Sequence, residues 1–114
     1  MEIDRGFLSA LLADDLKAMG FGFEDGEAVV EALCEATTEY LPGLRSAVAG
    51  AGMSEIGFFA HALKGTFNNF TAPQCVSLAE LFQTMEKEAK GTGTLETIND
   101  LMSRIEDELK VWLN

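Results

Sequence analysis

Apolar residues recur every three to four positions over most of this chain, and this spacing constrains its fold more than any other feature. An α-helix has about 3.6 residues per turn, so apolar groups at this interval form one stripe along a helix. Leu, Ala and Glu, which favour helices, are frequent, and strand patterns are weak. The helical pattern fills four long segments, at about residues 27–48, 54–70, 72–89 and 95–113.

The connections between these segments are short. A further amphipathic helix fits residues 4–19, ahead of a glycine-rich joint at 20–26. Glycine-rich joints at 50–52 and 91–93 separate the first two and the last two long segments. Because joints this short force consecutive helices to run antiparallel, we predict an all-α fold. It is an antiparallel up-down-up-down four-helix bundle, with the additional N-terminal helix packed across it.

Two prolines and a threonine refine the predicted boundaries. Pro42 lies inside the first long segment, but the periodicity resumes after it, so we predict a kink rather than a break. Thr71 and Gln74 have the spacing of a capping box, which would start a new helix after Thr71. Pro73 falls in the first turn of that helix, where its missing N–H does no harm.

Length and composition indicate one folded domain. The 114 residues are 47% hydrophobic and 24% charged, which is close to an ordinary globular protein. We expect a single domain over residues 1–114, with 1–24 as the N-terminal helix and joint and 27–114 as the four-helix bundle.

The charge of the chain disfavours two classes of partner. Nineteen acidic residues against eight Lys and Arg give a formal net charge of −11. Such a surface repels nucleic-acid phosphates and anionic membranes, so we expect protein or small-ligand partners. No stretch approaches the roughly 20 apolar residues of a membrane span, and the N-terminus lacks the basic region of a secretory signal. We therefore expect a cytoplasmic protein, and the initial Met with a complete bundle favours a stand-alone one.

The cysteines do not indicate a metal site or a disulfide. Cys34 and Cys75 are far apart, without CxxC spacing, in a chain that has one histidine. We predict that both are reduced thiols in the core, and that the chain holds no metal.

His61 departs from the apolar pattern of its segment. The core stripe of residues 54–70 passes through Phe59, Leu63, Phe67 and Phe70. At about 100° per residue, His61 lies about 160° around the helix from Leu63, so it should point to solvent near the middle of the helix.

The residues around His61 favour a reactive imidazole. Within about two helical turns it has Gly57, Phe58, Lys64, Gly65 and Asn68. Glycines on both sides would clear bulk for a closely approaching partner, and Lys64 could neutralise an anion on the ring. Neutral imidazole is a nucleophile near pH 7. Phe58, exposed beside the ring, would suit a docking patch. The opposing interpretation is an idle surface histidine, with glycines that serve close helix packing.

Residues 60–66 (AHALKGT), followed by Asn69 and Phe70, resemble the histidine-containing phosphotransfer (HPt) domain, whose pattern is His-x-Leu-Lys-Gly. The resemblance runs through the last three long segments, and we extend it over residues 27–114. Two positions depart from the family pattern: Thr71 stands where a glycine is common, and Phe67 where a small residue is. Phe67 lies on the core side, so we expect it to change packing more than chemistry.

The resemblance implies a phosphocarrier in a multistep His–Asp phosphorelay of a two-component system. His61 would accept a phosphoryl group from a receiver-domain aspartyl phosphate and pass it to another receiver. Lys64 would steady that group and Gly65 would let the receiver approach. Gly57, Phe58 and Asn68 are further candidates for phosphate or partner contact.

The same resemblance also implies which partners the chain has. These would be response-regulator receiver domains, a hybrid sensor histidine kinase, or both. The chain would be a stoichiometric intermediate rather than an enzyme, and a monomer that docks transiently. It would need no cofactor of its own, because Mg²⁺ is expected on the partner receiver.

Two other functions are compatible with a small acidic helical bundle. A non-phosphorylated helical adaptor would dock signalling partners without chemistry, and a buried His61, or Lys64 in an ion pair turned away from it, would favour it. An acyl-carrier type of bundle needs an Asp-Ser-Leu tripeptide at a helix start, and the sequence has none.

Overall fold

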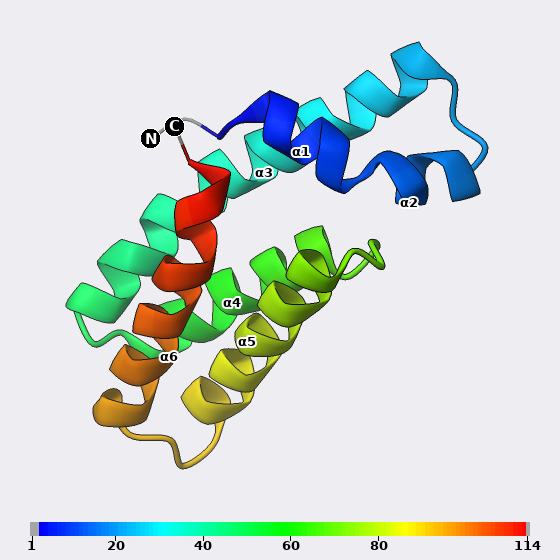
Figure 1. The fold of residues 1–114 in the computed structure, drawn as a ribbon. Helices are drawn as coiled ribbons and strands as arrows, with labels where there is room; N and C mark the ends of the chain where they lie inside the picture. Colours follow the sequence, from blue (N-terminus) through cyan, green and yellow to red (C-terminus); the bar gives the residue numbers. More distant parts are fainter. Residues whose placement is uncertain (1–2, 114) are drawn as a thin grey trace.

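The computed structural model describes residues 3–113, and they form an all-helical fold (Figure 1). The elements are α1 (Arg5–Leu11), α2 (Ala13–Ala18), α3 (Phe23–Ala49), α4 (Met53–Phe67), α5 (Pro73–Lys90), α6 (Leu95–Leu109) and the 3₁₀ helix η1 (Lys110–Trp112). Among the described residues there is no strand. An isolated antiparallel bridge joins Ile3 to Leu113, so the two ends of the described chain meet. The predicted all-α class is confirmed.

The long helices pack in the order in which they follow one another. α4 contacts α3 on one side and α5 on the other, and α6 contacts α5. Figure 1 shows α4 and α5 side by side, while the first half of α3 projects beyond them and has α1 beside it. The finer prediction, an up-down-up-down bundle, stays a prediction.

An aromatic cluster forms part of the core where three elements meet. Phe67 of α4 stacks on Phe82 of α5, with ring centroids 5.8 Å apart, and meets Trp112 of η1 edge-on at 5.4 Å. All three side chains are almost fully buried. Aromatic pairs of this kind contribute about 0.5–1.5 kcal/mol each beyond the area they bury. Phe67 therefore belongs to the packing of the core, as its position on the stripe predicts.

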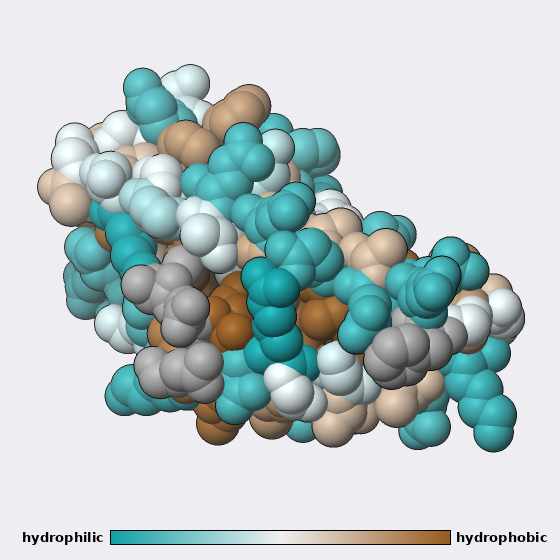
Figure 2. All heavy atoms as spheres, turned by 90° about the horizontal axis from the view of Figure 1, so that it is seen from above, coloured by the Kyte–Doolittle hydropathy of each residue, from teal (hydrophilic) through white to brown (hydrophobic). Residues whose placement is uncertain are grey.

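Polar side chains cover most of the face seen in Figure 2, with smaller apolar areas between them. The apolar stripes of the sequence account for the buried core, which includes both cysteine thiols. None of the helices within residues 3–113 combines the length and apolar character that crossing a membrane requires.

The N-terminal region differs from its prediction in two ways. The helix expected over 4–19 is two short helices that meet at Leu12 (φ −91°, ψ 0°). The joint expected over 20–26 is shorter, because α3 already begins at Phe23 and includes Gly26. A Cβ on Gly26 would stand 3.3 Å from Leu16 Cδ1, so this glycine leaves room for the Leu16 side chain of α2. The turn itself uses Gly20, whose φ is +77°.

α3 continues through Pro42 without a break, as the periodicity predicts. The next residue, Gly43, lies against α4: a Cβ there would stand 2.5 Å from the ring of Phe59. A larger residue at position 43 would therefore force Phe59 to move.

The predicted capping box at Thr71 is not formed. The N-cap of α5 is Ala72, which makes no side-chain cap bond, although Pro73 does lie in the first turn. Instead, the buried Asp15 of α2 accepts hydrogen bonds from the backbone N–H of Thr71 at 3.0 Å, from that of Ala72 at 3.1 Å, and from the Thr71 hydroxyl. A residue 56 positions away thus holds the two residues that precede α5.

Asp15 should give the fold an acid-sensitive component. The hydrogen bond from the Thr71 hydroxyl lowers the pKa of Asp15 below its usual 3.8, and backbone N–H groups lower it further against the effect of burial. Because this pKa is depressed in the folded state, the stabilisation is complete above the unfolded pKa and is lost as the pH falls through the folded value. Asp15→Asn should cost about 2 kcal/mol at pH 7 and flatten the acid side of the stability profile, measured by urea unfolding. Asp14→Asn, its exposed neighbour, is the control and should keep the original profile.

Candidate functional site

His61 lies on the exposed side of α4, as the periodicity predicts. Ala60, Leu63 and Phe67 of the same helix are fully buried, whereas the His61 side chain is 63% exposed. The ring therefore stands at the surface in the middle of a helix whose opposite side is anchored in the core.

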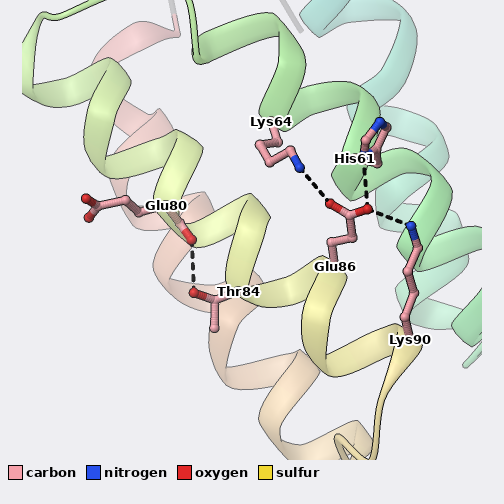
Figure 3. Close-up of polar contacts among 6 residues, drawn as sticks. All are labelled: His61, Lys64, Glu80, Thr84, Glu86 and Lys90. Carbon is pink, nitrogen blue, oxygen red and sulfur yellow. Dashed lines mark hydrogen bonds and ion pairs between the residues drawn. The ribbon is translucent and has the colours of Figure 1, made fainter.

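The ring is not free, because a buried carboxylate of α5 contacts it (Figure 3). His61 Nδ1 lies 2.9 Å from Glu86 Oε2, and Lys64 Nζ lies 3.1 Å from Glu86 Oε1. Lys90 Nζ lies 2.6 Å from the same Oε2 that His61 contacts. The Glu86 carboxylate thus contacts the His61 imidazole and the Lys64 ammonium group of α4, and the Lys90 ammonium group of its own helix α5.

Glu86 is held in its charged form. The hydrogen bond from Lys90 lowers the pKa of Glu86 most, and those from Lys64 and His61 lower it further. Burial acts in the opposite direction, yet the pKa falls from its usual 4.5 to about 2. At neutral pH the Glu86 carboxylate is therefore ionised and acts only as a hydrogen-bond acceptor.

This charge state fixes the tautomer of His61. Since Glu86 only accepts, the Nδ1 of His61 must carry the proton of their hydrogen bond. In the neutral imidazole the other nitrogen, Nε2, then holds the lone pair. The carboxylate thus sets both the tautomer and the orientation of the ring. The arrangement can present an oriented nitrogen nucleophile to a group that arrives from solvent.

Lys64 lies beside His61, although it is ion-paired. Its side chain is 26% exposed and bonds the same carboxylate that His61 contacts, so the pair is not turned away from the ring. Two lysines against one glutamate leave one net positive charge here, in a chain with a net charge of −11. The site is locally suited to an anion.

The two glycines that flank His61 differ from each other. A Cβ on Gly65 would find nothing within 4 Å, so this position is open, as expected. Gly57 is buried, and the prediction that it clears space for a partner is wrong. A Cβ there would stand 3.4 Å from two carbons of Lys90 and 3.9 Å from Ala89. Gly57 faces α5 and serves close helix packing.

Phe58 and Asn68 lie near the ring without contacting the Glu86 group. The Phe58 side chain is 61% exposed, the largest exposure among the bulky apolar residues described, and it meets Phe59 edge-on at 5.1 Å. Asn68 is exposed and ends α4, where its backbone N–H donates to the Lys64 carbonyl. Phe58 therefore widens the apolar surface beside His61.

Sequence reasoning missed Glu86 and Lys90. Glu86 follows Phe82 by four residues on α5, so it falls on the buried stripe of that helix. A buried carboxylate needs hydrogen-bond or charged partners. The position of Glu86 on an apolar stripe was therefore the signal in the sequence that it belongs to a polar site. Helical spacing identifies Lys90, four residues later, as one partner of Glu86, but it gives no indication that His61 of another helix is a second partner.

Other features of the chain lie apart from this site. Burial raises the pKa of Cys75 to about 12 and also raises that of Cys34, so neither is a reactive thiolate. A surface hollow of about 540 Å³ near the start of α3, lined by Leu16, Phe21 and Val30 among others, includes none of the residues around His61. Over residues 3–113, no three His, Cys, Asp or Glu side chains are grouped to hold a metal ion.

Comparison with known proteins gives one match. A family model described as "Hpt domain" matches residues 28–111, a segment that includes α4, α5 and α6 and leaves out α1 and α2. No curated protein and no solved structure matches the chain.

Proposed function

Because the chain belongs to the Hpt domain family, whose members transfer phosphoryl groups in His–Asp phosphorelays, we propose that it is a phosphocarrier and that His61 is its phospho-acceptor. The observation that supports this most is the exposed imidazole whose Nδ1 donates to the ionised Glu86. An idle surface histidine has no need of a buried carboxylate that fixes its tautomer.

The reacting atom in this proposal is Nε2. Its lone pair forms the N–P bond while the P–O bond of a receiver's aspartyl phosphate breaks, and the electron pair of that bond leaves with the aspartate carboxylate. The proton on Nδ1 stays in the hydrogen bond to Glu86, whose negative charge stabilises the positive charge that develops on the ring. Delivery to the next receiver reverses these steps.

The partners in this proposal are receiver domains, a hybrid sensor histidine kinase, or both, in the cytoplasm. Phe58 and the open surface at Gly65 give the receiver an apolar contact and a close approach. The receiver supplies the Mg²⁺, so the chain needs no cofactor of its own and is a stoichiometric carrier rather than an enzyme. Docking is transient and the chain is a monomer, with α3–α6 as an up-down-up-down bundle.

The proposal is tested by phosphate transfer from a panel of phosphorylated receivers. The chain should acquire a phosphoryl group that is labile in acid and stable in base, as expected for a phosphoramidate. Receivers that bind the chain but never transfer phosphate to it would contradict the proposal and support an adaptor.

A bulky residue in place of Gly65 should slow transfer more than it affects folding. Gly65→Gln would put a side chain into the open surface one turn from the ring, and we expect transfer to fall by about tenfold. Gly65→Ala adds one methyl group, and in a helix it should stabilise the fold by up to about 1 kcal/mol with little effect on transfer. Transfer rates and melting temperatures of both variants check this. A Gly65→Gln protein that melts much earlier but transfers at the original rate would make the glycine structural.

A further inference from the structure

The side chain of Lys90 crosses from α5 onto α4 at Gly57. Lys90 Cγ and Cε each lie 3.4 Å from the place of a Cβ on Gly57, so the stem of the lysine runs over the bare backbone of that glycine. The ammonium group ends 2.6 Å from Glu86 Oε2, the oxygen that also contacts His61 Nδ1. Figure 3 shows Lys64 and Lys90 on either side of the Glu86 carboxylate that contacts His61.

We propose that Lys90 is a second cation that binds the phosphoryl group on His61, and that Glu86 holds it in place before that group arrives. This inference rests on the proposed function of His61. It gives a positioning role to Glu86 and a phosphate-binding role to Lys90.

The charge of the phosphoryl group is the first reason. A phosphorylated side chain carries close to two negative charges at pH 7 and three strong acceptor oxygens. Lys64 supplies one positive charge, on a chain whose net charge is −11. With Lys90, the two lysines and the Glu86 carboxylate carry one net positive charge, which offsets part of the charge of the phosphoryl group.

The hydrogen-bonding capacity of Lys90 is the second reason. An ammonium group has three N–H donors, and the contact with Glu86 uses one of them. The Lys90 side chain is 61% exposed, so its remaining donors are open to an incoming group. Lys90 therefore has donors available for a phosphoryl oxygen in addition to its bond to Glu86.

An ordinary structural role for Lys90 would be that of a basic residue in the last turn of a helix, where it favours the helix dipole and pairs with a glutamate at i−4. Lys87 lies in the same last turn of α5 and is also exposed. It takes no part in the Glu86 contacts of the described structure. Lys87 is therefore the matched control, because it shares the helix-end position but not the place beside His61.

The experiment loads His61 with phosphoramidate, whose P–N bond breaks as ammonia leaves, and follows the phosphohistidine by ³¹P NMR. Lys90→Ala should shorten the lifetime of the phosphohistidine three- to tenfold at low salt. The effect should be smaller at high salt, because salt screens exposed ion pairs. Lys64→Ala should act similarly, Lys90→Arg should restore most of the lifetime, and Lys87→Ala should match the wild type. Equal lifetimes for Lys90→Ala and Lys87→Ala would overturn the proposal.

A double-mutant comparison separates direct contact from an effect through Glu86. If Lys90 binds the phosphoryl group itself, Lys90→Ala should still shorten the lifetime in a Glu86→Gln background. If Lys90 only neutralises Glu86, the effect should vanish there, and the proposed contact is wrong. Failure of the wild type to be loaded at His61, by phosphoramidate or by any phosphorylated receiver, would instead contradict the proposed function.

Discussion

His61→Gln is expected to abolish phosphoryl transfer to the chain while its fold stays intact. His61 is the only histidine in the sequence, so no other residue can form phosphohistidine. The Gln amide nitrogen is not a nucleophile, because its lone pair is delocalised into the carbonyl. The side chain is 63% exposed, so replacing it removes little buried surface. We expect a loss of stability of no more than about 1 kcal/mol, from the hydrogen bond to Glu86.

The measurement is the acid-labile phosphate incorporated from a phosphorylated receiver, with urea unfolding of the same samples. Gln can still donate a hydrogen bond toward Glu86, so it is a milder structural change than Ala. Acid-labile phosphate on the variant at the wild-type level would remove His61 from the mechanism. Loss of transfer together with loss of the folded state would leave the histidine structural, and His61→Asn then repeats the test with a shorter amide.

Glu86→Gln should lower the rate of transfer by about 10- to 100-fold, the usual range for a group that orients a reacting or ligating histidine. The amide keeps the shape of the carboxylate but loses its charge, so it no longer stabilises the cationic ring or both lysines. Its own N–H groups also allow the other tautomer of His61. The ¹⁵N chemical shifts of Nδ1 and Nε2 should therefore show a mixture of tautomers, where the wild type has its proton on Nδ1.

The acid stability of the same variant gives an independent check. The pKa of Glu86 is depressed to about 2 in the fold, so its stabilisation is present above about 4.5 and is lost as the pH falls toward 2. Glu86→Gln should lack this part of the acid transition. Glu80→Gln is the control, because Glu80 is exposed on the same helix and its side chain points away from His61 in Figure 3. A Glu86→Gln protein with wild-type transfer and wild-type shifts would show that Glu86 does not position the ring.

Much of the architecture could be predicted because helices are local structures. The periods of apolar residues fix the four long helices to within a few residues, and the glycine joints at 50–52 and 91–93 separate helices as expected. The errors occur where a long-range contact overrides a local pattern. Gly26 lies inside α3, where it leaves room for the Leu16 side chain, and α5 begins one residue later than expected, with Thr71 bonded to Asp15.

The sequence by itself determined the all-α class, the exposure of His61 and the presence of Lys64 and Gly65 on its helix, because each follows from about 100° of rotation per residue. Only the tertiary structure decided that Glu86, 25 residues away from His61, fixes the imidazole, and that the Lys90 side chain passes Gly57 on its way to Glu86. No sequence interval encodes these contacts. They depend on the rotation and height at which α5 packs on α4, and the whole core sets both.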